Sequence, residues 1–304
     1  MFYIFNKIQK NFIYILIFLM AILIWNFFLL HSIRNIFFDN EIVYMEGQVL
    51  GYTILLKQQG TYFFDIHNYP FIHGAYPPVY PAVVSIFLPW FGYTFTVGRF
   101  VSFISALLIV FFIYRILFEE SRNQKCSLIF AILFLAPYFI ISNSSLMRVD
   151  MLAILFSLIG FYLYVKYSKI HSPLRFFSIV FFILAFYTKQ NAIAAPLSIL
   201  VYNFFKNKKE CLQFFLLYTL PLVAIFAIFT ILTRGEFYLH IVKYTLATPL
   251  YFSTLFLIFQ DFFRLFSIFL VIFLFNIIYL KRYALYSLYF FISYNAELYK
   301  TRWQ

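Results

Sequence analysis

Apolar runs long enough to cross a membrane recur along this sequence, and short segments rich in Lys and Arg separate them. Hydrophobic residues make up 64% of the chain and charged residues only 11%, whereas a soluble domain is roughly 45–50% apolar and 25% charged. A water-soluble fold has too little interior to bury that much apolar surface. Because one helical crossing takes roughly 20 apolar residues, the chain has no room for a sizeable soluble domain. The sequence therefore predicts an all-α, polytopic transmembrane protein in which residues 1–304 form a single transmembrane domain.

The apolar runs predict about eight crossings, at residues 12–30, 99–117, 127–142, 151–166, 174–188, 191–205, 212–232 and 265–280. Pro and Gly interrupt the apolar material before residue 99, so we expect residues 83–91 to lie in or against the membrane interface. The stretch 283–294 falls short of a span, which leaves residues 283–304 as a C-terminal tail. The first run is too long for a signal-peptide core and lacks a small-residue cleavage site, so it is interpreted as an uncleaved anchor.

The cations indicate the orientation of the chain. If the N-terminus lies in the cytoplasm, the short loops dense in Lys and Arg all fall on the cytoplasmic side, as the positive-inside rule requires. The net charge of +12 therefore indicates topology, and no nucleic-acid partner is expected. Cys126 and Cys211 border these cytoplasmic loops, so a disulfide is not expected.

One long polar segment follows the first crossing, at residues 31–81, and Gly and Pro residues break it repeatedly. Loops of this length are usually functional or disordered, and the Tyr and Phe content argues against disorder. We expect an extracytoplasmic loop that carries one or two short helices along the membrane surface.

Carboxylates are rare and unevenly placed. Of the eleven in the chain, seven are assigned to the outer face: Asp39, Glu41, Glu46, Asp65, Asp150, Glu236 and Asp261. An ionised carboxylate at the end of a crossing is costly unless it is solvated or paired. If the outer loops around residues 39, 148 and 189 meet, one cavity would hold carboxylates for base chemistry and cations for a phosphate.

Simpler interpretations remain open for several of these residues. Arg148 and Asp150 also fit an interface anchor or a helix cap, and so does Lys189. His67 and His73 fit ordinary polar loop residues better than metal ligands, so no metal site is predicted. The sequence contains no phosphate-binding glycine loop, nucleophile elbow or zinc-binding helix motif.

Five pieces in order resemble a known family: the acidic residues after the anchor, YPPVYP at 76–81, GRFVS at 98–102, RVDMLA at 148–153 and LAFYTKQ at 184–190. They resemble the GT-C membrane glycosyltransferases, and most closely glycosyltransferase family 39, the protein O-mannosyltransferases, with its bacterial aminoarabinose-transferase relatives. The resemblance covers roughly residues 10–205.

The resemblance implies an inverting transferase that moves a sugar from a polyprenyl-phosphate-linked donor to a lipid, glycan or protein acceptor, without a cofactor. It implies a multi-pass protein of the bacterial cytoplasmic membrane whose active face points outward. By position, the base that deprotonates the acceptor is Asp39, with Glu41 as the competing candidate because Asn40 separates the two acids. The expected donor-phosphate ligands are Arg148 and Lys189. The expected supporting residues are Asp150, Tyr76, Tyr80 and Asp65, although both tyrosines also fit an interfacial aromatic belt.

The main alternative is a multi-pass transporter or lipid-carrier flippase without glycosyl transfer. Such proteins place ionisable or helix-breaking residues near the bilayer midplane. The centres of the predicted crossings are nearly free of charge, and prolines such as Pro196 and Pro221 are few within them. A purely structural membrane subunit is a further alternative, but it gives no reason for a long ordered loop with carboxylates at its root.

Overall fold

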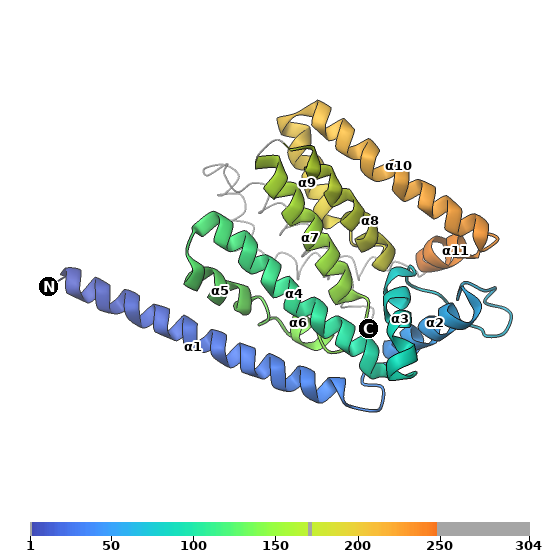
Figure 1. The fold of residues 1–304 in the computed structure, drawn as a ribbon, viewed down its shortest axis with the longest axis horizontal. Coiled ribbons are helices and arrows are strands. Elements are labelled where there is room, and N and C mark those ends of the chain that lie inside the picture. Colours follow the sequence, from blue (N-terminus) through green and yellow to red (C-terminus); the bar gives the residue numbers. More distant parts are fainter. Residues whose placement is uncertain (1, 170–171, 248–304) are drawn as a thin grey trace. The chain divides into compact units, whose positions relative to one another are not determined.

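The computed structural model describes residues 2–169 and 172–247, and within these ranges every regular element is a helix (Figure 1). The α-helices are α1 (Phe2–Ile36), α2 (Met45–Gln59), α3 (Val79–Phe91), α4 (Phe95–Ser121), α5 (Gln124–Leu133), α6 (Tyr138–Asn143), α7 (Asp150–Lys169), α8 (Ser178–Thr188), α9 (Ala194–Lys206), α10 (Lys208–Leu232) and α11 (Glu236–Tyr238). A 3₁₀ turn, η1 (Pro173–Phe177), precedes α8, and a π-helical turn, η2 (Leu239–Tyr244), follows α11. The prediction of an all-α fold is confirmed for these residues.

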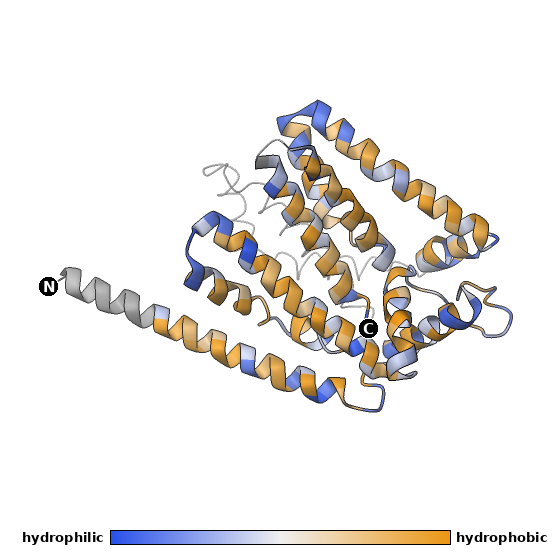
Figure 2. Ribbon diagram, in the orientation of Figure 1, coloured by the Kyte–Doolittle hydropathy of each residue, from blue (hydrophilic) through white to orange (hydrophobic). Residues whose placement is uncertain are grey.

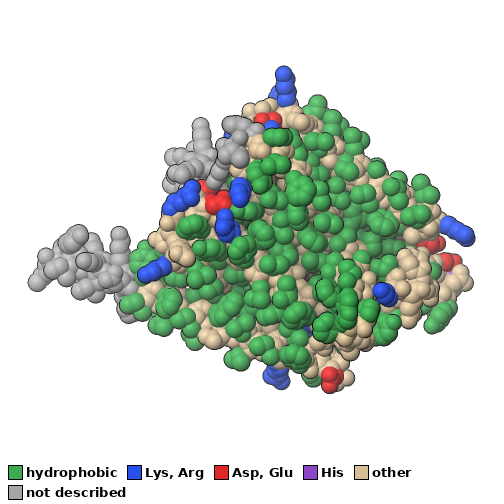
Figure 3. All heavy atoms as spheres, viewed as in Figure 1, with side chains coloured by type: hydrophobic (Ala, Val, Ile, Leu, Met, Phe, Trp, Pro, Cys, Tyr) green, Lys and Arg blue, Asp and Glu red, His purple; other side chains and the backbone are tan. Residues whose placement is uncertain are grey.

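Four of the described helices are long and apolar enough to span a membrane: Tyr14–Ile36, Phe95–Ser121, Asp150–Ser168 and Lys208–Leu232. They coincide with four of the predicted crossings. Figure 2 shows them as largely hydrophobic along their length, and large apolar side chains such as Leu30 and Ile231 are about three-quarters exposed, at 72% and 75%. In Figure 3 hydrophobic side chains cover much of the visible surface. Apolar helices that expose such side chains need lipid around them, so the chain is an integral membrane protein.

Other predicted crossings differ in the structure. The segment 127–142 is not one helix, because α5 ends at Leu133 and α6 begins after Pro137. Proline has no N–H for the helical ladder and disfavours helical geometry in the residue before it, which explains the break. The segment 174–188 divides into η1 and α8, and α9 has only 13 residues. The predicted crossing at 265–280 and the tail at 283–304 lie outside the described residues.

The predicted loop segment, residues 31–81, contains the helix α2, which ends at Gly60, whose φ of +76° suits glycine. The first helix, α1, continues through Ile36 into this segment. The apolar segment predicted at 83–91 is part of α3, which is separated from α4 by a break at residues 92–94.

Contacts between Cα atoms divide the chain into two compact units. The first unit comprises Met1–Gly60 with Tyr80–Leu155, and the second comprises Thr61–Val79 with Phe156–Gln304. In the first unit α1 packs against α4 and α5 (Figure 1). A side chain at Gly98 would place its Cβ 2.2 Å from Cγ of Met147, so glycine at this position is what lets α4 approach the segment between α6 and α7.

An aromatic core holds the second unit together. Its buried members are Phe161, Tyr164, Ile179, Phe182, Ala195, Ile199, Phe214 and Tyr218. Two hydrogen bonds supplement this apolar packing. Asn203 donates to the Tyr164 hydroxyl at 2.6 Å, and the Tyr187 hydroxyl donates to the carbonyl of Leu222 at 2.7 Å. These contacts fix the end of α8. The segment 189–193, called the Lys189 turn, begins there.

Candidate active site

A fully buried ion pair joins α2 to the start of α4 in the first unit. Arg99 donates from Nε to Oε1 of Glu46 and from Nη2 to Oε2, each at 2.8 Å, and both side chains have no exposed surface. This two-pronged geometry is the strongest form of an arginine–carboxylate contact. It fixes the Arg99 guanidinium beside the loop that follows α1.

The other N–H groups of Arg99 bind the backbone around Asp39. Nη1 donates to the carbonyl of Asn35 at 2.8 Å and to the carbonyl of Phe38, and Nη2 donates to the carbonyl of Asn40 at 2.7 Å. The last carbonyls of a helix have no partner within the helix, so Arg99 satisfies the end of α1. It also binds the carbonyl of the residue before Asp39 and the carbonyl of the residue after it.

Glu46 connects this loop to a third segment of the chain. Its carboxylate accepts the backbone N–H of Met147 at 2.7 Å and that of Ile42 at 2.8 Å. Burial on its own would raise the pKa of Glu46, but the hydrogen bonds from Arg99 and from these two amides outweigh burial and lower the pKa below its usual range. The loop after α1, the start of α4 and the segment before α7 therefore meet around one ionised carboxylate.

Asp39 and Glu41 have different surroundings. The Glu41 carboxylate accepts the backbone N–H of Gly47 at 2.9 Å, in the first turn of α2, which is how an acidic side chain caps a helix N-terminus. The Asp39 side chain is exposed, and in the part of the chain that the structure describes it has no hydrogen bond or ion pair. Of the two candidate bases, Asp39 is the one whose carboxylate is not engaged within these residues.

Arg148 and Asp150 follow Met147, whose backbone N–H binds Glu46. Both side chains are buried, and Nε of Arg148 donates to Oδ2 of Asp150 at 3.2 Å. The carbonyl of Arg148 accepts a hydrogen bond from Ser102 on α4 at 3.2 Å. Asp150 is the first residue of α7, where a negative charge is favourable. This geometry suits a helix-start ion pair, and the donor-phosphate role of Arg148 stays a prediction.

Tyr80 has a packing role in the structure. It is fully buried on α3, its hydroxyl donates to the carbonyl of Gly98 at 2.8 Å, and the same oxygen lies 3.1 Å from Oγ of Ser102. These contacts fix the ring between α3 and the start of α4, and the supporting role of Tyr80 in the site stays a prediction.

In the second unit, the Lys189 turn and the α2–α3 loop (residues 61–78) contact each other. Lys189 is buried and caps the end of α8, where its N–H donates to the carbonyl of Ala185 at 2.9 Å. Nε2 of Gln190 donates to the carbonyl of Ala75 at 3.1 Å. Tyr76, partly exposed, accepts the Tyr62 hydroxyl at its backbone carbonyl at 2.7 Å. The turn and loop that the sequence assigned to one site are thus joined directly.

Asp65 forms a local turn in the α2–α3 loop. Oδ1 accepts the backbone N–H of His67 at 3.0 Å, and Oδ2 accepts the side-chain amide of Asn68 at 2.8 Å, as in an Asx turn. Its supporting role in catalysis stays a prediction. Within residues 2–169 and 172–247, no three His, Cys, Asp or Glu side chains come close enough together to hold a metal ion, so the structure assigns no metal ligands there.

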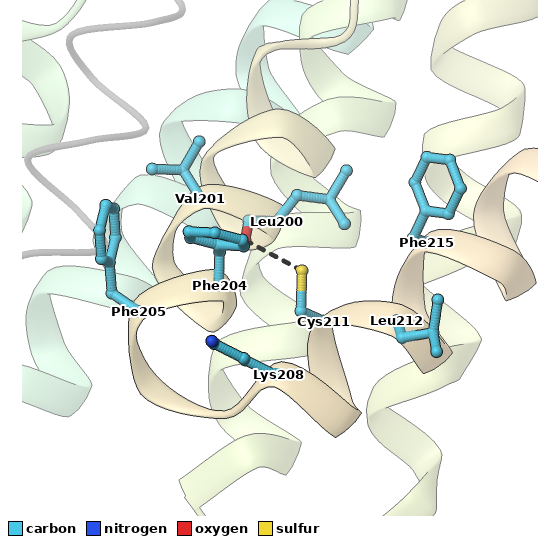
Figure 4. Close-up of a pocket in the computed structure, with 8 residues that line it drawn as sticks. All are labelled: Leu200, Val201, Phe204, Phe205, Lys208, Cys211, Leu212 and Phe215. Atoms are coloured by element: carbon cyan, nitrogen blue, oxygen red, sulfur yellow. Dashed lines mark hydrogen bonds between the residues drawn. The ribbon is translucent and has the colours of Figure 1, made fainter.

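A groove of about 610 Å³ lies between α9 and α10 (Figure 4). It is lined by Leu200, Val201, Phe204, Phe205, Lys208, Cys211, Leu212 and Phe215. Among the described residues that line it, Lys208 carries the charge. The groove lies where α9 ends and α10 begins, whereas Lys189 precedes the start of α9.

Sequence reasoning missed the central roles of Glu46 and Arg99. Both were noted, Glu46 as one of the outer acids and Arg99 within the GRFVS segment, but neither was proposed as part of the site. The available signal was an arginine at the start of an apolar helix. A charge in that position is costly unless it is paired, and the structure shows its partner.

Comparison with protein-family models gives a match that covers the central part of the chain. The family model described as dolichyl-phosphate-mannose-protein mannosyltransferase matches residues 75–233, which is more than half of the chain. The match includes Arg99, Arg148 and Lys189. The curated proteins and the solved structures contain no match. The chain therefore belongs to the dolichyl-phosphate-mannose-protein mannosyltransferase family and is a membrane glycosyltransferase of the GT-C type.

Proposed function

We propose that the protein is an inverting transferase that moves a sugar from a polyprenyl-phosphate carrier to an acceptor hydroxyl at the extracytoplasmic membrane face, with Asp39 as the catalytic base. The observation that carries the proposal is the setting of Asp39. Its carboxylate is exposed, while Arg99 binds the carbonyls of Phe38 and Asn40 on either side. A base that is accessible and also fixed in place has the properties that general-base catalysis needs.

The proposed reaction is a single displacement. The acceptor oxygen forms a bond to the anomeric carbon as its proton passes to the Asp39 carboxylate. The bond between the anomeric carbon and the phosphate oxygen breaks, and the electron pair leaves with the polyprenyl phosphate. Attack opposite the leaving group inverts the configuration at that carbon. Glu41 is not assigned the base because its carboxylate caps α2 through Gly47.

The leaving phosphate gains charge in the transition state, and we propose that Arg148 and Lys189 stabilise that charge. Both are buried cations that the sequence places at outer loops. Asp150 then orients the Arg148 guanidinium through the ion pair at 3.2 Å. We assign Tyr76 and Asp65 to the acceptor side, because both belong to the α2–α3 loop.

The function is tested by reconstituting the purified full chain in liposomes with radiolabelled polyprenyl-phosphate mannose, the donor class that the family description names. Supplied with a hydroxyl-bearing peptide or glycan acceptor, the protein should form a glycoside whose anomeric configuration, measured by NMR, is opposite to that of the donor. Retention of configuration would exclude the single displacement. Movement of the donor across the bilayer without any glycoside would favour the flippase alternative.

Lys189→Ala should raise KM for the polyprenyl-phosphate donor about tenfold or more, because a charge-assisted contact to phosphate contributes about 1.5–3 kcal/mol. KM for the acceptor should stay close to the wild-type value, and steady-state kinetics with each substrate varied in turn separates the two. Lys208→Ala, at the first residue of α10, is the matched control and should change neither constant. An unchanged donor KM in both Lys189→Ala and Arg148→Ala would refute the phosphate role.

A further inference from the structure

His240, on the π-helical turn η2, is bound at both ring nitrogens to the α2–α3 loop. Its buried ring accepts the backbone N–H of Gly74 at Nδ1, at 2.9 Å, and Nε2 lies 2.7 Å from the carbonyl of Phe64. An amide N–H can only donate and a carbonyl can only accept. Both bonds therefore exist together only when the ring is neutral and carries its hydrogen on Nε2.

Aromatic packing surrounds this pair of bonds. The ring of His73 stacks on that of His240 with centroids 5.5 Å apart, and Nε2 of His73 lies 3.2 Å from the carbonyl of His240. Phe63 and Tyr244 meet the His240 ring edge-on at 5.7 and 5.4 Å. A Cβ on Gly74 would come 2.9 Å from the Phe63 ring, so a glycine is what allows the loop to come this close.

The charges around His240 come from three elements. On α11, Oε2 of Glu236 lies 3.6 Å from Nε2. The α2–α3 loop contributes Asp65, His67 and His73, and η2 itself carries the exposed Lys243 and the half-buried Tyr244. Burial lowers the pKa of His240, and His73 lowers it further. These effects outweigh the Phe64 carbonyl and Asp65, which act in the opposite direction.

We infer that His240 is a positioning residue that, in its neutral form, latches the α2–α3 loop between Phe64 and Tyr76, and that protonation of Nδ1 opens the latch. The added hydrogen on Nδ1 would face the N–H of Gly74. Two donors would then oppose each other, and the hydrogen bond between Gly74 and His240 would be lost. The loop is also bound through Ala75 to Gln190, next to Lys189. The link from the latch to catalysis rests on the proposed function, whereas the latch itself does not.

The direction of the pH effect follows from proton linkage. The latched state disfavours the proton, so opening takes up a proton once the pH falls below about 6.5, the ordinary pKa of histidine. From there the opening equilibrium rises by up to about tenfold per pH unit. The latch is therefore expected to be closed at pH 7.5 and increasingly open toward pH 5.5.

Hydrogen–deuterium exchange of the full chain in lipid nanodiscs tests the latch directly. After correction for the intrinsic pH dependence of exchange, the protection of peptides covering residues 64–76 should fall by up to about tenfold between pH 7.5 and 5.5. Peptides from the aromatic core around Phe182 should not. Equal corrected protection of residues 64–76 at the two pH values would overturn the inference.

Two substitutions separate positioning from general packing. His240→Asn keeps an acceptor for the Gly74 N–H but cannot titrate, so protection should persist at both pH values. His240→Phe keeps the ring and removes the acceptor, so protection should be low at both. Survival of the wild-type pH dependence in His240→Asn would contradict the latch. If His240→Phe also loses protection in the aromatic core, the substitution has disturbed the fold. The test then depends on comparing the pH dependence of protection in the wild type with that in His240→Asn.

Two matched controls test whether another histidine of the loop is responsible. His67→Asn and His73→Asn should both retain the pH dependence of the wild-type protein, and its loss in either would assign the effect to that residue. In the transfer assay, the acceptor KM should rise at pH 5.5 for the wild type and stay level for His240→Asn. If residues 64–76 show the pH-dependent protection but the protein transfers no sugar, the proposed function would be refuted and the inference about the latch would be retained.

Discussion

Asp39→Asn is expected to lower the rate of sugar transfer by about 10²- to 10⁴-fold, because the amide cannot accept the proton of the acceptor hydroxyl. Asn keeps the size and polarity of the side chain, and the backbone bonds from Arg99 to Phe38 and Asn40 do not involve it. Membrane insertion and thermal stability should therefore match the wild type. The measurement is single-turnover transfer from polyprenyl-phosphate mannose in liposomes.

Glu41→Gln is the matched control for this substitution. It should keep a rate within a few-fold of the wild type, and because the Gln oxygen can still accept the N–H of Gly47, it should cost only about 0.3–1 kcal/mol of stability for the charge lost near the helix N-terminus. Its carboxylate caps α2 through the N–H of Gly47. An inactive Glu41→Gln beside a fully active Asp39→Asn would move the base to Glu41, and full activity in both would remove both candidates.

Arg99→Met is expected to have the second-largest effect, on stability and on activity together. Removing one partner of a buried ion pair leaves an uncompensated charge, here on Glu46, and typically costs about 3–5 kcal/mol. It also frees the carbonyls on both sides of Asp39, so transfer should fall even in the fraction of protein that remains folded. The thermal unfolding midpoint in detergent and the transfer rate per folded molecule measure the two effects separately.

The double variant Arg99→Met with Glu46→Met distinguishes positioning from stability. Apolar replacement of a whole buried pair is often neutral or stabilising, so the midpoint should recover, but the loop carbonyls would still lack their donor and transfer should stay low. Recovery of both properties would show that the pair only stabilises the fold. As a control, Arg115→Met breaks the half-exposed pair with Glu119, 3.4 Å long, and should cost less than about 1 kcal/mol.

The sequence predicted a helix well wherever the residues of one continuous segment determine whether it forms. Runs such as 99–117 and 212–232 are largely apolar, and both became long helices, the second one with Pro221 inside it. The run 127–142 is also apolar, yet α5 ends at Leu133 and α6 begins after Pro137, which lacks an N–H and restricts the residue before it. The helix α2 was also predictable, because it lies in an ordered polar segment and a glycine, Gly60, marks its end.

The site was less predictable, because its connections join residues far apart in the chain. Glu46 reaches Arg99 and Met147, which are 53 and 101 positions away, and nothing in the local pattern around Glu46 indicates either partner. The choice between Asp39 and Glu41 depended on a cap that only coordinates reveal. His240 gave no signal at all, since a single histidine beyond the last motif has no pattern to distinguish it.

The saturation of Arg99 has a consequence for how this enzyme can recognise its donor. Its guanidinium has five N–H hydrogens, and the structure commits all of them, to Glu46 and to the carbonyls of Asn35, Phe38 and Asn40. None is left for a lipid phosphate, although an arginine beside the loop that carries the proposed base is the natural first choice for that task. Attempts to change donor selectivity should therefore leave Arg99 unaltered and vary the proposed phosphate ligands, Arg148 and Lys189.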